Sequence, residues 1–348
     1  MATDAAAGTI LVTGANGGLG SAIVQHIVTK PEFAAYHGLY TVRDTAHASD
    51  LTAALAHGPA HSHSIVSVDL ANLDNVRQAA EKINGRVSSG DIPPIRALIL
   101  NAGFQDFGKQ SWTADEFDTT FAVNYLGHWL LTLLLLKSID KENGRIVIIG
   151  SQAHDPNNPK NASTKAFDDP KYKSFLSDAD SFHAIAKGKW SPATEDASFR
   201  GGFRRYGAAK YFQINMQHEL QARLNADPAL NKISVVGVDP GPMITGLQRL
   251  APWVIRVLVF KIVYPLILYT KPNNGMVRST TRSASDVLKG AFAVGEGGNP
   301  PKDMYWDGRT PAETSEESRD ASKRELVWKE TVKLTGLKEG ETVLANWS

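Results

Sequence analysis

Short apolar runs alternate with longer amphipathic stretches along most of this 348-residue chain, and this alternation limits its fold more than any other feature. The runs are rich in β-branched residues and almost continuously apolar, which is typical of strands buried on both faces. The stretches between them have helical periodicity, for example at 73–87, 116–138 and 204–223. We predict strands at 9–13, 39–42, 64–69, 97–101, 145–151 and 234–239. Alternating strands and helices predict an α/β fold with a doubly wound parallel sheet.

Two long segments interrupt this alternation. Residues 152–203 form a polar stretch, and residues 242–285 hold an apolar segment between Gly- and Pro-containing flanks. Both follow predicted strand ends, and ligands of such sheets bind outside the carboxyl ends of the strands. We therefore expect a single domain, 1–348, with a substrate-side insertion at 152–203 and a lid region at 242–285.

Composition excludes several classes of function. The net charge is +1, which gives no electrostatic argument for nucleic-acid binding. Cysteine is absent, so neither a disulfide nor a thiolate nucleophile is available. No basic and apolar leader precedes the first strand, and we expect a cytoplasmic protein. His57, His61 and His63 lack further ligands at a suitable spacing, so no metal site is predicted.

The first predicted strand leads into a glycine-rich turn, Thr13 to Gly20, followed by an apolar helix. Its glycines, at 14, 18 and 20, allow a tight turn and close approach of the backbone to a diphosphate. The amides at the start of the following helix suit the same anion. The spacing is G-x-x-x-G-x-G, which differs from the G-x-G-x-x-G of other dinucleotide-binding folds.

Further motifs follow in a fixed order. They are Asp69-Leu70, Asn101-Ala102-Gly103, Asn124, Ser151, Tyr206 with Lys210, Pro240-Gly241 and Thr245. The ordered set resembles the short-chain dehydrogenase/reductase family, in its retinol-dehydrogenase-like and protochlorophyllide-reductase-like branch, including some fungal members. The resemblance implies a Rossmann fold over residues 8–310. It implies a nicotinamide cofactor bound by Gly14, Asn16, Gly18, Leu19, Arg43, Asp69, Leu70, Asn101, Ala102, Gly103, Tyr206, Lys210, Pro240, Gly241 and Thr245.

The chemistry of the late motif agrees with this resemblance. Tyr206 and Lys210 are four residues apart, so they share one helix face. A nearby ammonium is expected to lower the pKa of the phenol and to make it a better acid. Ser151 can hydrogen-bond the substrate oxygen where charge develops. By resemblance, Asn124 would hold a water that links Lys210 to solvent.

The end of the second strand bears on the choice of cofactor. Relatives that prefer NAD place an acid there to bind the ribose 2′-hydroxyl, whereas this chain has Val42 followed by Arg43. A guanidinium suits a phosphate. We therefore expect NADP(H).

Ser151 and Tyr206 are 55 positions apart, which is far more than in most relatives. The extra residues, 152–203, put the substrate class in doubt and leave the catalytic set unchanged. Within this block His154, and also His183, could lie near the site entrance and contact substrate.

The apolar segment 253–269 has three interpretations. It is a lid over a lipophilic substrate, a peripheral membrane contact with Arg256 and Lys261 reaching the headgroups, or a core or dimer helix. A homo-oligomer is thus one expectation for the partners of the chain. Residues Arg256 and Lys261, together with Pro265, argue against a membrane span.

The sequence predicts an NADPH-dependent oxidoreductase that transfers a hydride to the ketone or aldehyde of a lipophilic small molecule, such as a secondary metabolite. Tyr206 protonates the oxygen and Ser151 polarises it. Two alternatives remain. One is a non-catalytic NADP(H)-binding regulatory protein on the same fold, and the other is a reductase of a conjugated C=C bond.

Overall fold

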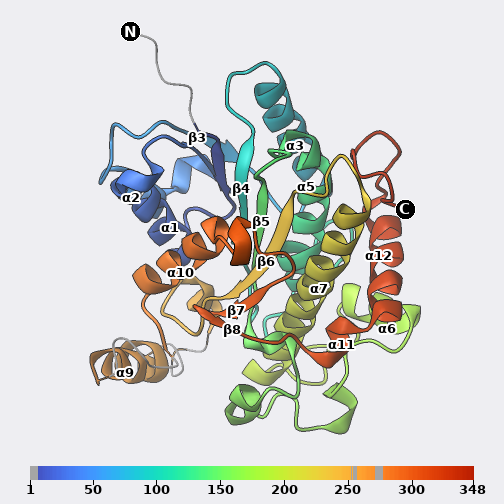
Figure 1. The fold of residues 1–348 in the computed structure, drawn as a ribbon. Coiled ribbons are helices and arrows are strands. Elements are labelled where there is room, and N and C mark those ends of the chain that lie inside the picture. The colour runs from blue at the N-terminus through green and yellow to red at the C-terminus, as the bar shows by residue number, and fades with distance from the viewer. Residues whose placement is uncertain (1–6, 252, 254–256, 271–276) are drawn as a thin grey trace.

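One eight-stranded sheet forms the centre of the protein in the computed structural model, which describes residues 7–251, 253, 257–270 and 277–348 (Figure 1). The strand order is β3-β2-β1-β4-β5-β6-β7-β8, and neighbours pair in parallel except β7 with β8. The strands are β1 (Thr9–Val12), β2 (His37–Val42), β3 (His63–Ser67), β4 (Ile95–Leu100), β5 (Arg145–Ile149), β6 (Ser234–Asp239), β7 (Tyr305–Asp307) and β8 (Thr310–Pro311). This is the predicted doubly wound α/β architecture.

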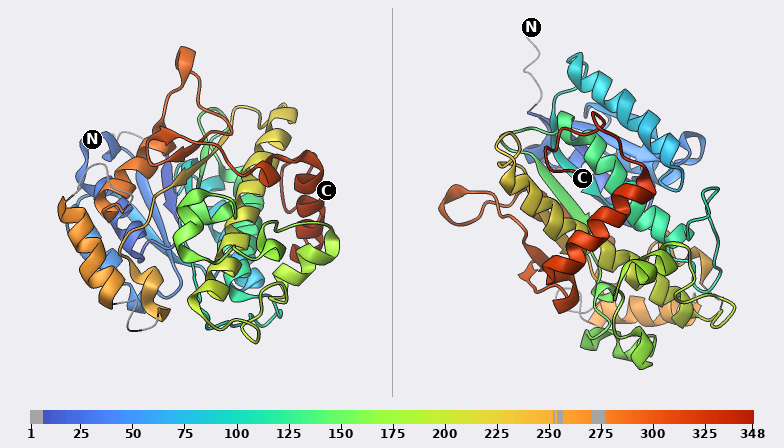
Figure 2. Two further views of the ribbon diagram at one scale, coloured as in Figure 1. Left: turned by 90° about the horizontal axis from the view of Figure 1, so that it is seen from below. Right: turned by 90° about the vertical axis from the view of Figure 1, so that its right-hand side faces the viewer.

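Helices cover both faces of the sheet (Figures 1 and 2). Helices α1, α2 and α10 pack on one face, and α3, α5 and α7 pack on the other, with α12 outside α7. The helices are α1 (Gly18–Thr29), α2 (Ser49–Leu55), α3 (Leu73–Ser88), α4 (Thr119–Phe121), α5 (Gly127–Leu135), α6 (Ala179–Ala186), α7 (Phe199–Ala226), α9 (Tyr264–Thr270), α10 (Thr280–Phe292), α11 (Glu316–Arg319) and α12 (Ala321–Thr335).

Burial on both sides explains the continuous apolar strands. In β1, Ile10 and Val12 enter the core beneath α1 and α10, whereas Leu11 enters the core beneath α3 and α5. All three side chains are fully buried. Strand β3 differs, because it is the end strand and its residues alternate between exposed and half-buried. The prediction of burial on both faces was wrong for this strand.

The apolar stretch predicted as one helix at 116–138 contains a π-helical turn, η3 (Ala122–Leu126), between α4 and α5. The helical stretch as a whole begins at residue 119, because the Asp118 carboxylate accepts hydrogen bonds from the amides of Thr120 and Phe121. Among the described residues, 119–138 has the length and hydropathy of a membrane span, but 89% of that window is buried inside the protein. The apolar character of this stretch is therefore explained by its burial in the protein core.

Both elaborations lie at one end of the molecule (Figures 1 and 2). The insertion consists of the short turns η5 (Gln152–His154), η6 (Pro159–Thr164) and η7 (Pro170–Tyr172), followed by α6. Its last residues, 199–203, belong to α7. The lid region holds η8 (Gly246–Leu250), η9 (Leu258–Val263) and α9. Residues 280–285, predicted as lid, instead begin α10, which packs against α1.

Candidate active site

A large cavity of about 990 Å³ opens at the carboxyl ends of the strands. Binding sites of small ligands have roughly this size or less. All predicted site residues line it except Asn124: Gly14, Asn16, Gly18, Leu19, Arg43, Asp69, Leu70, Asn101, Ala102, Gly103, Ser151, Tyr206, Lys210, Pro240, Gly241 and Thr245. The fold thus brings together motifs that are spread over more than two hundred residues of sequence.

The glycine-rich turn needs its glycines because of close backbone approach. Gly14 has a φ of +64°, and a Cβ there would lie 2.8 Å from the Cα of Ala102. A Cβ at Gly20 would lie 2.3 Å from the carbonyl oxygen of Gly14. The side-chain amide of Asn101 donates to the carbonyl of Thr13 at 2.7 Å. The turn and the Asn101-Ala102-Gly103 motif are therefore fixed to each other.

Two residues that are predicted to bind the cofactor form hydrogen bonds within the protein. The Asn16 side chain accepts from the Leu51 amide at 3.0 Å and donates to the His47 carbonyl at 3.2 Å, which ties the turn to α2. The Asp69 carboxylate accepts from the Ala71 amide at 3.0 Å. Both residues line the cavity, and their contact with a cofactor remains a prediction.

Three predicted catalytic groups meet on one wall of the cavity. The Ser151 side chain, just beyond β5, interacts with the phenol of Tyr206 on α7 and offsets part of the rise in the pKa of that phenol. The Lys210 ammonium lies 5.5 Å from the centre of the Tyr206 ring. It donates to the carbonyl of Ile149 at 2.8 Å and to Oε1 of Gln213 at 2.7 Å. These contacts hold Lys210 beneath the phenol.

The electrostatics of the pair differ from the prediction. Burial raises the pKa of Tyr206 above its ordinary value, and the Asp239 carboxylate raises it further. Burial also lowers the pKa of Lys210 to about 7, which weakens the expected effect of its positive charge on the phenol. The prediction that Lys210 brings the pKa of Tyr206 below its usual value was therefore wrong for this structure. Tyr206 is a protonated phenol, which is the form that can donate a proton.

Asn124 lies in the π-helical turn, and its side chain serves the protein. Its amide nitrogen donates to the carbonyls of Phe104 and Thr120, each at 2.7 Å. Its side-chain oxygen accepts from the Phe104 amide at 3.2 Å. The side chain thus positions the loop that follows Asn101-Ala102-Gly103, and the water-holding role remains a prediction.

The sequence reasoning missed a role for His128, which is fully buried. Its Nε2 lies 2.9 Å from Oγ1 of Thr13, and its Nδ1 lies 3.2 Å from the Asn124 carbonyl. Thr13 Oγ1 already accepts from the amides of Asn101 and Ala102. Thr13 therefore donates to Nε2, and the Nδ1 hydrogen goes to Asn124. The neutral imidazole fits its pKa, which burial lowers to about 3.

We expect His128→Leu to lower the free energy of unfolding by ~1–3 kcal/mol, because it removes two buried hydrogen bonds, those to the Thr13 hydroxyl and to the Asn124 carbonyl. Since Thr13 orients the amides of two cofactor-lining residues, the KM for the cofactor should also rise. Denaturant unfolding and steady-state kinetics measure the two effects. The exposed His57 provides a control, and His57→Leu should change stability by less than ~0.5 kcal/mol. Equal losses in both variants would contradict this role.

Arg249 is a second residue that the sequence reasoning missed. It lines the cavity with Arg43, and its pKa is lowered by burial and by the Arg43 charge nearby. Its guanidinium also lies 5.4 Å from the centre of the Phe104 ring. Two guanidinium groups that face one cavity favour an anionic group between them.

His154 and His183, considered as substrate contacts, have structural partners. His154 is buried, and its Nε2 accepts from the Ser315 amide at 3.1 Å. Nε2 of His183 lies 3.0 Å from the Glu330 carboxylate on α12. Neither histidine is among the described residues that line the cavity. The insertion reaches the cavity through other residues, namely Gln152, Lys160, Ser163, Thr164, Phe199 and Phe203.

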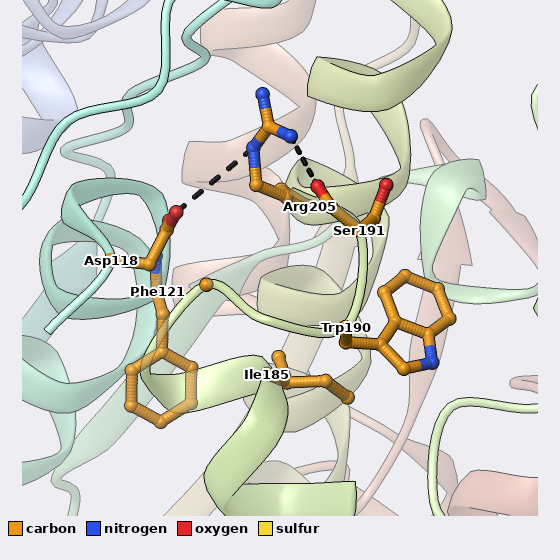
Figure 3. A pocket seen from close by; sticks show the side chains of 7 residues that line it. Asp118, Phe121, Ile185, Trp190, Ser191 and Arg205 are labelled. Atoms are coloured by element: carbon orange, nitrogen blue, oxygen red, sulfur yellow. Dashed lines mark hydrogen bonds and ion pairs between the residues drawn. The ribbon is translucent and has the colours of Figure 1, made fainter. Parts of the chain in front are cut away.

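Two arginines directly before Tyr206 anchor its helix. Arg205 forms a bidentate ion pair with Asp106 at 2.8 and 2.9 Å. The Asp118 carboxylate lies 4.0 Å from the same guanidinium (Figure 3). It also donates to the carbonyl of Ser191 in the insertion. Arg204 binds Asp196 at 2.8 Å. The insertion and the loop after β4 are thus both fixed to the helix that carries the catalytic tyrosine.

The fold and the site define a dinucleotide-binding oxidoreductase. A family model described as short chain dehydrogenase matches residues 8–166. The short-chain dehydrogenase iccH of Talaromyces variabilis is 43% identical over 361 residues, covering 98% of this chain and 99% of that protein. The chain belongs to the short-chain dehydrogenase family and is an enzyme of that family.

Other relatives agree with this assignment. Protochlorophyllide reductase B of Hordeum vulgare is 29% identical, covering 95% of this chain and 79% of that protein, which confirms the predicted likeness to this branch. The NADPH-bound carbonyl reductase from chicken fatty liver has a TM-score of 0.58 at 16% identity, covering 88% of this chain and 98% of that chain. The angucycline C-6 ketoreductase LanV with bound NADP has a TM-score of 0.56 at 17% identity, covering 88% and 95%. These structures share the fold.

Proposed function

We propose that this enzyme uses NADPH to reduce the carbonyl group of a lipophilic small molecule to an alcohol. The observation that carries the proposal is the meeting of Ser151, Tyr206 and Lys210 on the wall of a cavity that also contains the glycine-rich turn. Such a cavity can hold a dinucleotide and a second molecule side by side. The names of the solved neighbours, a carbonyl reductase and a ketoreductase, support the same class of reaction.

The residues of this chain fit a nicotinamide dinucleotide. Gly17, before the first turn of α1, has no side chain to cap the helix, and Gly18, Leu19 and Gly20 line the cavity, so the amides of this turn are available to a diphosphate. The crowded glycines at 14 and 20 leave no room for side chains in this cradle. When bound, the cofactor supplies the hydride.

The protein side of the reaction follows from the geometry. The substrate carbonyl oxygen accepts hydrogen bonds from Ser151 and Tyr206, which concentrates positive potential where negative charge develops. As the carbonyl carbon gains the hydride, Tyr206 gives its proton to the oxygen, and the product is an alcohol. Lys210, held by Ile149 and Gln213, stabilises the phenolate that remains.

The lining of the cavity supports a lipophilic substrate. Apolar side chains come from the loop after β4, from the start of α7 and from the lid region. They are Phe104, Phe107, Phe199, Phe203, Met243, Leu247 and Tyr264. Burial of one such side chain against substrate contributes roughly 1.5–3 kcal/mol. A lipophilic secondary metabolite fits this apolar part of the lining.

Arg43 and Arg249 are proposed to bind the 2′-phosphate that distinguishes NADPH from NADH. We expect Arg43→Ala to weaken NADPH binding by ~1.5–3 kcal/mol, which is typical of a lost hydrogen bond to a charged group. NADH, which lacks the phosphate, should bind the variant almost as it binds the wild type. Titration of both proteins with both cofactors, followed by nicotinamide fluorescence, tests the assignment. Equal losses for the two cofactors would remove Arg43 from the phosphate site.

A further inference from the structure

A patch of exposed apolar side chains lies on the lid region. Seven of the twelve large hydrophobic residues that are exposed in the described part of the chain lie between residues 244 and 269. We call these seven the outer patch: Ile244, Trp253, Leu258, Ile262, Val263, Leu266 and Tyr269. Exposed apolar patches of this kind mark protein or membrane contacts. Helix α9, which carries Leu266 and Tyr269, projects from the body of the fold (Figure 1).

The patch is ordered along one helical face. Leu258, Ile262 and Leu266 are spaced by four residues, so their side chains follow one side of η9 and α9. Tyr264 is on the same segment but lines the cavity. The segment therefore has one side toward the proposed substrate and an apolar side toward the surroundings. A lid whose only task is to cover substrate needs no apolar outer side.

The charge of this region is one-sided. Residues 240–285 contain six Lys or Arg residues and no Asp or Glu, although the whole chain has a net charge of only +1. Arg278 and Arg282 pair with Asp307 and Asp286. Of the other four, Arg249 lines the cavity, which leaves Arg256, Lys261 and Lys271 for the surface of this region, and Arg256 and Lys271 lie outside the described residues. A surface of anionic phospholipid complements this charge.

The alternative partner, a second copy of the chain, fits less well. A two-fold dimer places the same patch against itself, so the basic residues of one copy would oppose those of the other. Two aromatic members of the patch, Trp253 and Tyr269, are exposed by 68% and 86%. Tryptophan and tyrosine are enriched at the level of lipid headgroups because their rings are apolar with a polar edge.

We infer that the segment carrying the outer patch lies in the interface of an anionic phospholipid bilayer. Leu258, Ile262 and Leu266 enter the boundary of headgroups and acyl chains, and Tyr264 remains over the cavity. On the proposed function, a lipophilic ketone dissolved in the bilayer then reaches the active site without crossing bulk water. The lid interpretation then applies to the side of this segment that faces the cavity, and the membrane interpretation applies to the side that carries the outer patch.

Flotation with vesicles tests the inference without cofactor or substrate, so its outcome is separate from that of the proposed activity. Wild-type protein is mixed with vesicles of phosphatidylcholine alone, or of phosphatidylcholine and phosphatidylserine in equal amounts. We expect binding to the phosphatidylserine vesicles that weakens with added salt, because exposed charges are screened. The double variant Ile262→Asp/Leu266→Asp should bind at least about tenfold more weakly.

A matched control changes two exposed valines outside the patch, in the double variant Val294→Asp/Val343→Asp. It adds the same charge and should lose less than about threefold, because only the long-range attraction is reduced. The inference would be overturned if the wild-type protein bound to neither kind of vesicle. Equal losses in the two double variants would overturn it as well. A wild-type dimer in sedimentation velocity that Ile262→Asp/Leu266→Asp separates would assign the patch to a second copy and would also overturn it.

Discussion

Replacing Tyr206 by phenylalanine is expected to lower kcat for carbonyl reduction by about a hundredfold or more. The variant keeps the ring and loses only the transferable proton, and general acid catalysis typically contributes 10²–10⁴-fold. Affinity for NADPH should change little, because the glycine-rich turn and the arginines remain. Stopped-flow or steady-state assays give kcat, and a fluorescence titration gives the dissociation constant.

Tyr305 provides a control for this prediction. It is a second buried tyrosine close to the site, and a Cβ at Gly150 would lie 2.4 Å from its hydroxyl. It does not line the cavity among the residues described there. Tyr305→Phe should therefore keep kcat within about threefold of wild type. Retention of more than about a tenth of wild-type kcat by Tyr206→Phe would remove that residue from the role of acid.

The second large effect is expected in stability, from Arg205→Met. Arg205 and Asp106 are exposed by only 4% and 1%, and Asp118 is buried beside them (Figure 3). The substitution leaves two buried carboxylates without their cation, and loss of one partner of a buried ion pair costs about 3–5 kcal/mol. Denaturant unfolding at neutral pH measures the loss.

Arg200→Met on the same helix is the matched control. The Arg200 side chain is 54% exposed and lies 3.9 Å from Asp196, and exposed pairs of this kind contribute about 0–1 kcal/mol. The penalty in Arg205→Met should shrink as the pH falls. Burial raises the pKa of Asp118, and Arg205 opposes this rise, so without Arg205 the folded variant takes up a proton before the unfolded chain does and gains stability. A loss below about 1 kcal/mol would show that the ion pair does not anchor α7.

The sequence predicted six of the strands and most of the residues that line the cavity. Strands such as Thr9–Val12 are fully buried, and their apolar runs carry a strong signal. The glycines, Ser151, Tyr206 and Lys210 were found because their motifs depend on short spacings or on order along the chain. Strands β7 and β8, with three and two residues, are too short to give a periodic pattern.

Other features depend on contacts between distant residues, which no local pattern shows. The pKa of Lys210 reflects the burial of its side chain between α7, which carries it, and the end of β5. The hydrogen bonds of the Asn124 side-chain amide depend on the loop at Phe104. His128 lies 115 positions from Thr13, its hydrogen-bonding partner. The insertion is another example. Some of its residues line the cavity, and others bind Arg204 and Arg205 and so hold α7 in place, which its sequence does not reveal.

Transfer of deuterium to a lipophilic α,β-unsaturated ketone tests the central claim most directly. The enzyme is mixed with this ketone and with NADPH carrying deuterium at the transferable position of the nicotinamide, and the product is analysed by mass spectrometry and NMR. The account predicts an allylic alcohol with deuterium on the former carbonyl carbon, and no such product from Tyr206→Phe. A saturated ketone with deuterium on the β-carbon would show that the enzyme reduces the C=C bond. NADPH binding without turnover of this ketone or of any other carbonyl compound in a broad panel would contradict the account and favour a non-catalytic NADP(H)-binding protein.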